Sequence, residues 1–261
     1  VLFPFLIRVK DELVTLTTDV GCLLLANGAE IYRVEESMLR IFRAYGVYTG
    51  EVFAIPTCIN VTVVTPQGKP ITLIRRLPTR STDLDKVEKG NDLCRRICRD
   101  KPDFKTIRRE LEEIKHRPVY SLGFQILAFA MVSFSFTLFY GGDFSDAICS
   151  MFCGAAIKIV CYNMNKFDTN AFIVNIIASF AAGLIAMTAA YINMSLNPDK
   201  IIIGALMNLV PGIAITSFMR DMIDGDLMAG IIRFMESLLV ATAIAIGAGL
   251  ALTATRAVLG V

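Results

Sequence analysis

Five long apolar segments in the second half of this 261-residue chain constrain its fold more than any other feature. They cover approximately residues 119–140, 145–164, 170–192, 201–219 and 228–253. A helix needs about 20 apolar residues to cross the roughly 30 Å hydrocarbon core of a bilayer, and each segment is near that length. The third, AFIVNIIASFAAGLIAMTAAYINM, is apolar around its whole circumference, unlike a helix on the surface of a soluble protein. We therefore predict an α-helical transmembrane bundle over residues 119–261.

Most of the charged residues precede these segments. Residues 1–118 hold 20 of the 26 Lys and Arg and 16 of the 24 Asp and Glu, a net charge of +4. Residues 119–261 hold the remaining 6 and 8, a net charge of −2. This partition indicates that the first part of the chain folds in water and the second in lipid.

Residues 1–118 have the pattern of a small α+β domain. Residues 5–26 have helical spacing, and so does AEIYRVEESMLRIFRAYG, whose apolar face consists of Ile31, Val34, Met38, Ile41 and Phe42. Runs of β-branched residues then predict strands over 51–55, 58–65 and 70–76, two of which form a hairpin. A helix capped by Thr82 or Asp83 and another over 103–115 complete the domain before a boundary at 116–118.

The distribution of Lys and Arg predicts the orientation in the membrane, because cytoplasmic loops carry an excess of these residues. The basic domain before residue 119 is expected in the cytoplasm, at the inner face of a cell membrane. The acidic link GGDFSD is expected outside, and the link with Lys166 inside. Five crossings place the C-terminus outside.

Pro211 and Gly212 interrupt the fourth apolar segment and predict a broken helix. Pro removes a backbone donor and clashes with the preceding turn. A break inside the membrane creates a helix N-terminus, whose free N–H groups can hold a substrate carboxylate. Asn208, Thr216 and Lys158 are candidates for further substrate contacts. The alternative is a kink that only shapes the bundle.

A group of charged residues follows the break: Arg220, Asp221, Asp224, Asp226, Arg233 and Glu236. Glu236 lies about two turns inside the fifth segment, and an ionisable residue within a membrane is a functional candidate by default. These residues are candidates for an inner gate or a proton-coupling site. The alternative is a structural cluster of ion pairs that fixes the loop.

The composition gives little support to other classes of function. The single histidine, His116, and the lack of a nucleophile–base spacing argue against an enzyme. We interpret the seven cysteines as small buried residues, and we expect no metal and no cofactor. The chain has neither a Walker motif nor a G-x-G-x-x-G motif, so we expect an ion gradient, most simply of protons, to drive transport. The basic stretch LCRRICRDKPDFKTIRRE indicates contact with phospholipid rather than with nucleic acid.

The chain resembles the threonine/serine exporter family over nearly its whole length. The resemblance rests on LLLANGAEIYRVEESMLRIFRAYGV, EVFAIPTCINVT, TDLDKVEKGNDLCRRI and GALMNLVPGIAITSFMRDMIDGDLMAGIIRFMESLLVA, which occur in the family's order. It implies export of threonine and serine or, in a related two-subunit branch, of a dicarboxylate such as succinate. It also implies a gating or subunit-contact role for Gly28, Glu30 and Arg33.

Fused members of the family carry about twice as many spans as this chain. The resemblance therefore implies the larger subunit of a split exporter, with a second, smaller membrane subunit as its partner and further oligomerisation. Two other interpretations stay open at this point. One is a membrane-anchored enzyme whose α+β domain carries the chemistry, and the other is a scaffold that recruits a partner through that domain.

Overall fold

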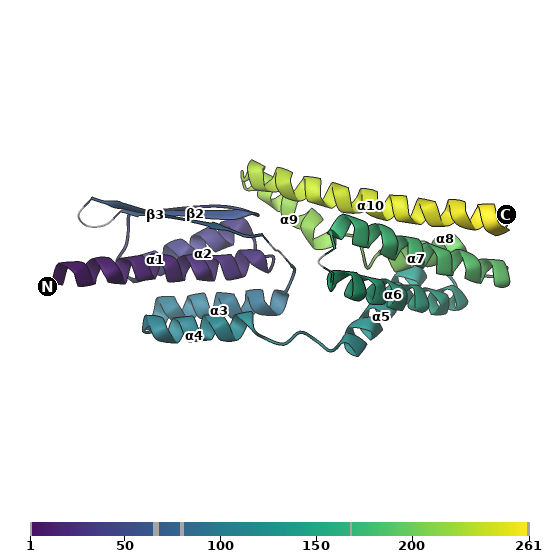
Figure 1. Ribbon diagram of the computed structural model, residues 1–261, viewed down its shortest axis with the longest axis horizontal. Coiled ribbons are helices and arrows are strands. Elements are labelled where there is room, and N and C mark those ends of the chain that lie inside the picture. Colours follow the sequence, from purple (N-terminus) through teal and green to yellow (C-terminus); the bar gives the residue numbers. More distant parts are fainter. Residues whose placement is uncertain (1, 65–67, 79–80, 168, 260–261) are drawn as a thin grey trace. The chain divides into compact units, whose positions relative to one another are not determined.

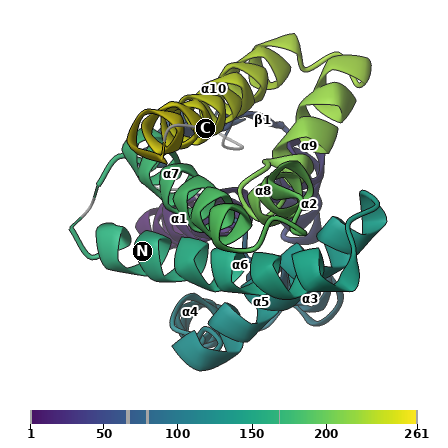
Figure 2. The same ribbon diagram turned by 90° about the vertical axis from the view of Figure 1, so that its right-hand side faces the viewer.

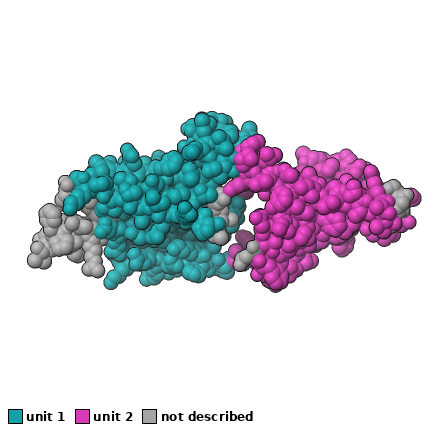
Figure 3. All heavy atoms as spheres, turned by 45° about the horizontal axis from the view of Figure 1, so that its top comes forward, with its two compact units in different colours: residues 1–118, 217–233 teal, residues 119–216, 234–261 magenta. Residues whose placement is uncertain are grey.

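The computed structural model describes residues 2–64, 68–78, 81–167 and 169–259, which form two compact units (Figures 1 and 3). Unit 1 comprises residues 1–118 and 217–233, and unit 2 comprises residues 119–216 and 234–261. The boundaries between the units after residues 216 and 233 fall inside helices α9 (Gly212–Ile223) and α10 (Leu227–Leu259). Residues 217–233, which follow the first part of α9, thus belong to the same unit as the α+β domain.

Unit 1 is built in layers. Strands β1 (Gly50–Ile55), β2 (Cys58–Val64) and β3 (Pro70–Arg76) form an antiparallel meander in that order, which confirms the predicted strands. The sheet contacts α1 (Leu2–Ala26) and α2 (Ile31–Ala44). Helix α3 (Leu84–Asp100) contacts both of these helices, and α4 (Phe104–Lys115) contacts α1, so α1 and α2 lie between the sheet and the second helix pair (Figure 1).

The apolar periodicity of the sequence accounts for the core of this unit. Every predicted residue of the inner face of α2 is buried, namely Ile31, Val34, Met38, Ile41 and Phe42. On the central strand Ile59, Val61 and Val63 are buried in alternation, because successive strand side chains point to opposite faces. Asp83 is the N-cap of α3 and accepts a hydrogen bond from the backbone N–H of Lys86 at 3.2 Å, as one of the two predicted capping residues.

Unit 2 is a helical bundle (Figure 2). Helices α5 (Leu122–Phe139), α6 (Phe144–Asn165) and α7 (Ala171–Ile192) pack in sequence, and the short α8 (Pro198–Leu206) contacts all three. The later part of α10 packs on α7, where a Cβ added to Gly183 would lie 2.6 Å from the Ala251 Cβ. Small residues at such contacts let helix backbones approach closely in lipid.

The surface of these helices identifies lipid as their solvent. Only 17% of the α5 window is buried, although its mean hydropathy is 1.9. Large apolar side chains such as Phe139, Phe152 and Ile192 are more than two-thirds exposed. Exposing this much apolar surface to water would be unfavourable by about 25 cal/mol per Å². The bundle is therefore that of a membrane protein rather than the core of a soluble one.

The prediction of five spans is not confirmed. Among the described residues, four helices are long and apolar enough to cross a membrane: Leu122–Phe139, Phe144–Asn165, Ala171–Ile192 and Leu227–Val258. The remaining predicted span, 201–219, is not one helix. It contains part of α8, which has 9 residues in all, and part of α9, which has 12 residues in all. Each is shorter than the roughly 20 residues that a spanning helix needs. The physical reason is the interruption at Pro211.

Candidate functional site

The interruption of the fourth apolar segment separates two helices. α8 ends at Leu206 and α9 begins at Gly212, with turns and no helix between them. The Leu209 and Val210 N–H groups both donate to the Leu206 carbonyl, at 2.9 and 3.2 Å, which closes the end of α8. The predicted broken helix is confirmed, and α9 has its own N-terminus next to a residue that has no N–H.

Two of the predicted substrate-binding residues meet at Phe129 of α5. The Asn208 amide nitrogen donates to the Ser133 hydroxyl at 2.7 Å and to the Phe129 carbonyl at 3.2 Å. The Lys158 ammonium lies 5.0 Å from the centre of the Phe129 ring, in cation–π range. Lys158 comes from α6 and Asn208 from the α8–α9 connection, and the structure brings both to one turn of α5.

The α5–α6 contact is very close at this point, which explains a glycine there. A Cβ added to Gly154 would lie 2.6 Å from the Phe129 carbonyl oxygen, closer than real Cβ atoms approach other atoms. The glycine therefore permits the backbone approach that holds Phe129 and Lys158 together.

The beginning of α9 is open. A Cβ added to Gly212 would meet no atom of the described residues within 4 Å. The Thr216 hydroxyl donates to the carbonyls of Gly212 and Ile213, at 3.3 and 3.0 Å, so its proton is used within α9 and its lone pairs are left as acceptors. An added side chain at Gly212 would thus enter free space rather than disturb packing.

The charged residues after the break form a cluster with the Gly28–Arg33 motif, entirely within unit 1. Glu30 forms ion pairs with Arg33, at 2.6 Å, and with Arg220 of α9. The Arg233 guanidinium donates to the Ala29 carbonyl at 3.2 Å. The two motifs therefore meet at one place, although Ala29 and Arg233 are separated by 204 positions in the sequence.

Gly28 shapes the first motif. Its φ is +95°, and its N–H and that of Ala29 close the end of α1 on Leu25 and Leu24, at 3.2 and 3.0 Å. This left-handed cap favours glycine because it has no Cβ. The turn presents the Ala29 carbonyl and Glu30 to the α9–α10 corner.

Asp221 and Arg233 form the buried part of the cluster. Their side chains are 1% and 11% exposed, and the Arg233 Nε lies 3.4 Å from the Asp221 Oδ2. That Oδ2 has no hydrogen-bond partner among the described residues. Burial raises the pKa of Asp221 above its usual value, the Arg233 charge opposes the rise, and the nearby Asp226 and Asp224 add to it.

The corner between α9 and α10 holds the last two predicted acids. The Asp226 N–H donates to the Asp221 carbonyl at 2.8 Å, and the Asp226 carbonyl accepts from the Gly230 N–H at 2.9 Å. Asp224 lies exposed in the turn itself. Ala229 of the first turn of α10 is 2% exposed and belongs to the hydrophobic core of unit 1. This packing explains why the corner folds with unit 1.

Two groups at this cluster are not indicated by any pattern in the sequence. The Ala29 carbonyl binds Arg233, and no side-chain pattern identifies a carbonyl. Glu35 is half-buried and accepts a hydrogen bond from the Ala54 N–H at 2.7 Å. Burial raises the pKa of Glu35, although the Ala54 hydrogen bond opposes this, and Asp226 raises it further.

Glu236 follows Arg233 on α10. It lies on the part of α10 that belongs to unit 2, whereas Arg220, Asp221 and Arg233 belong to unit 1. Its assignment to the gate stays a prediction. Two ion pairs at i, i+3 and i, i+4 spacing lie at the beginning of α2 and along it, Glu30–Arg33 at 2.6 Å and Glu36–Arg40 at 2.7 Å.

The raised pKa of Asp221 predicts a pH dependence of stability. Between the ordinary value of about 3.9 and the raised value, the folded state binds more protons than the unfolded state. The contribution of this carboxyl group to the free energy of unfolding is therefore fully present below about pH 4. It is lost as the pH rises through the pKa of the folded state. Thermal unfolding of the detergent-solubilised protein should show wild type losing stability relative to Asp221→Asn as the pH rises. A constant difference between the two proteins would contradict this.

Sequence comparisons agree with these features. The model of the ThrE family, described as a threonine/serine exporter, matches residues 15–255. The chain is 22% identical over 244 residues to the threonine/serine exporter of Corynebacterium glutamicum, which covers 90% of this chain and 50% of that protein. It is 21% identical over 238 residues to a protein of Mycobacterium tuberculosis named as a probable threonine/serine exporter, with 90% and 45% covered.

The chain thus spans about half the length of the curated relatives it matches. No solved structure matches it. The family match extends through unit 1, the helix break and the bundle, and the apolar surface of the long helices requires lipid. This chain is therefore a multi-pass membrane protein that belongs to the ThrE family of threonine/serine exporters.

Proposed function

We propose that this chain exports a small hydroxylated amino acid, threonine or serine, from the cytoplasm as a secondary transporter in the inner membrane. The observation that carries the proposal is the break at 207–211, whose second helix leads directly into the charged cluster. Broken helices with exposed N-termini hold carboxylate substrates in several transporter folds. The names of the relatives support the amino-acid substrate.

In this proposal the substrate binds at the start of α9. The Gly212 N–H donates to the Val210 carbonyl at 2.8 Å, so the N–H groups of the next two residues, Ile213 and Ala214, hold the carboxylate. The helix N-terminus adds partial positive charge there. Lys158 adds a cation, and among the described residues no carboxylate lies within ion-pair distance of it. Asn208 and Thr216 supply polar contacts to the substrate, with the Asn208 carbonyl oxygen as a free acceptor beside its bound amide nitrogen.

The charged cluster is proposed as the inner gate and the proton-coupling site, with the α+β domain in the cytoplasm. α9 carries Gly212 and Thr216 of the proposed substrate site as well as Arg220 and Asp221, so a movement of this helix changes both sites together. The Glu30–Arg220 pair is partly exposed and exchanges at small cost, whereas Asp221 is buried and its raised pKa suits proton uptake. Glu236 is retained as a second candidate for proton coupling.

We also propose that a second, smaller membrane subunit completes the transporter. The length of the relatives, about twice the matched part, is consistent with a transporter made of two halves. The two-subunit branch of the resemblance adds a dicarboxylate such as succinate as the alternative substrate, which the same N–H groups would accept.

Reconstituted liposomes test the function. Vesicles that contain the chain, with and without the candidate second subunit, are loaded with labelled threonine, serine or succinate under an imposed pH gradient. We expect efflux of threonine and serine that requires the partner and collapses when a protonophore removes the gradient. Efflux of succinate alone would change the substrate class, and no efflux of any of the three with the partner present would refute the proposal.

A further inference from the structure

A groove between α2 and α3 in unit 1 is lined by an unusual number of arginines. Its volume is about 950 Å³. Five arginines line it, against a single carboxylate, that of Glu36: Arg33, Arg40 and Arg43 from α2, and Arg95 and Arg99 from α3. The side chains that line it therefore have a net charge of +4.

Helical spacing explains why the arginines face one another. On α2 the positions 33, 36, 40 and 43 recur every three or four residues, and on α3 the positions 91, 95 and 99 recur every four. Cys94 and Cys98 of α3 also line the groove, and Cys94 is buried. The two helices thus present a basic stripe on each side of an apolar floor.

The intramolecular partners of these arginines are exposed and leave one charge unmatched. Arg40 pairs with Glu36, Arg95 with Asp92, and Arg99 with Asp100. No carboxylate pairs with Arg43 among the described residues. Exposed ion pairs are worth about 0–1 kcal/mol, so a stronger anion can take over these guanidinium groups at little cost.

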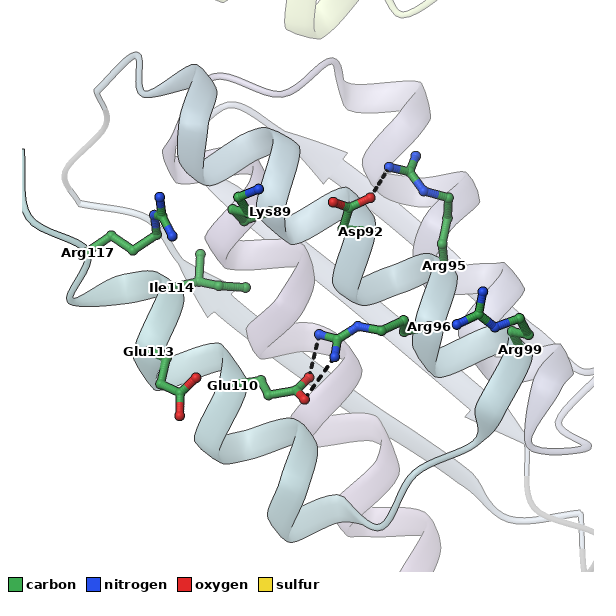
Figure 4. Close-up of a pocket in the computed structure, with 9 residues that line it drawn as sticks. All are labelled: Lys89, Asp92, Arg95, Arg96, Arg99, Glu110, Glu113, Ile114 and Arg117. Carbon is green, nitrogen blue, oxygen red and sulfur yellow. Dashed lines mark hydrogen bonds and ion pairs between the residues drawn. The ribbon is translucent and has the colours of Figure 1, made fainter.

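In the neighbouring groove between α3 and α4, acidic residues of the same domain neutralise the basic side chains (Figure 4). There Arg96 donates two hydrogen bonds to Glu110, at 3.0 and 2.7 Å, and Arg95 points away from this pair toward Asp92. Three carboxylates line that groove, against one in the α2–α3 groove. Each of the five cations that line it has an acidic partner, whereas Arg43 of the α2–α3 groove has none among the described residues.

We infer that the α2–α3 groove binds a ligand that carries a cluster of phosphate groups. Planar guanidinium groups donate paired hydrogen bonds to phosphate oxygens, and several arginines around one cavity match several phosphates better than one carboxylate. The ligand is either a free oligophosphate or the headgroup of a lipid with more than one phosphate. Both share the chemistry that the groove recognises.

Arg33 connects the groove to the charged cluster. It lines the groove and at the same time pairs with Glu30, which also binds Arg220. A phosphate bound to Arg33 would compete with Glu30 and so alter the Glu30–Arg220 pair. This regulatory consequence rests on the proposed function, whereas the binding itself does not.

Arginine modification tests the binding without a transport assay. The full-length chain in phosphatidylcholine nanodiscs is treated with phenylglyoxal, and modification of each arginine is followed by mass spectrometry. One arm adds sodium tripolyphosphate, and the other replaces part of the lipid with cardiolipin. We expect one of the arms to slow the modification of Arg43 and Arg95 several-fold, which also identifies the source of the phosphates.

Arg109 is the internal control, because it is 71% exposed, pairs with Glu113 at 3.7 Å and lines neither groove. Its modification should be unchanged in both arms at about 0.15 M salt, where long-range attraction is screened. The double variant Arg43→Gln/Arg95→Gln should weaken binding of the effective phosphate compound by roughly tenfold or more, and Arg109→Gln should not. Absence of protection in both arms, or equal protection of Arg109, would overturn the inference whatever the outcome of the efflux assay.

Discussion

The variant Arg233→Met is expected to lose roughly 3 kcal/mol of unfolding free energy, because removing one partner of a buried ion pair leaves the other charge uncompensated. Asp221 is 1% exposed and has no hydrogen-bond partner at Oδ2 among the described residues. The variant also removes the hydrogen bond to the Ala29 carbonyl. For a chain of this size the loss corresponds to a fall in Tm of roughly 6–12 °C, which thermal unfolding in detergent measures.

Two further variants separate the buried charge from the loss of a long side chain. Adding Asp221→Asn to Arg233→Met should restore part of the stability, because it neutralises the unpaired carboxylate. Arg109→Met removes an exposed arginine of the same length and should change stability by less than about 0.5 kcal/mol. If Arg233→Met behaves like Arg109→Met, the pair does not hold the corner together.

The variant Gly212→Leu is expected to abolish export while the protein stays folded. An added side chain at this position meets no atom of the described residues within 4 Å, so packing does not oppose it. It would fill the space beside the Ile213 and Ala214 N–H groups in the first turn of α9, where the proposed substrate carboxylate binds. Efflux of threonine and serine from cells or liposomes measures the effect, with Tm as the check on folding.

Gly249 offers a matched control for this experiment. It also lies in unit 2, and a Cβ added there likewise meets nothing within 4 Å. Gly249→Leu should therefore leave efflux near the wild-type rate, and Gly212→Ala should give an intermediate rate because its side chain is shorter. Equal efflux from Gly212→Leu and Gly249→Leu would remove the helix break from the substrate site.

Local patterns in the sequence predicted those features whose causes are local. The buried face of α2, from Ile31 to Phe42, follows from helical spacing, and the strand boundaries follow from runs of β-branched residues. The break before Gly212 follows from the missing N–H of Pro211. The number of spans did not follow from the sequence, because hydropathy does not show whether a broken apolar segment still crosses the membrane as one helix.

The membrane class, the α+β domain and the helix break were determined by the sequence alone, since period, composition and proline chemistry act within a few residues. Only the tertiary structure decided that Glu30 meets Arg220 and that the Ala29 carbonyl meets Arg233 across 204 positions. Packing of Ala229 into the core of unit 1 sets that meeting, and no local pattern encodes which distant surfaces fit together. The arginine groove between α2 and α3 has the same origin, because each helix shows its own basic stripe but only their packing makes the two stripes face each other.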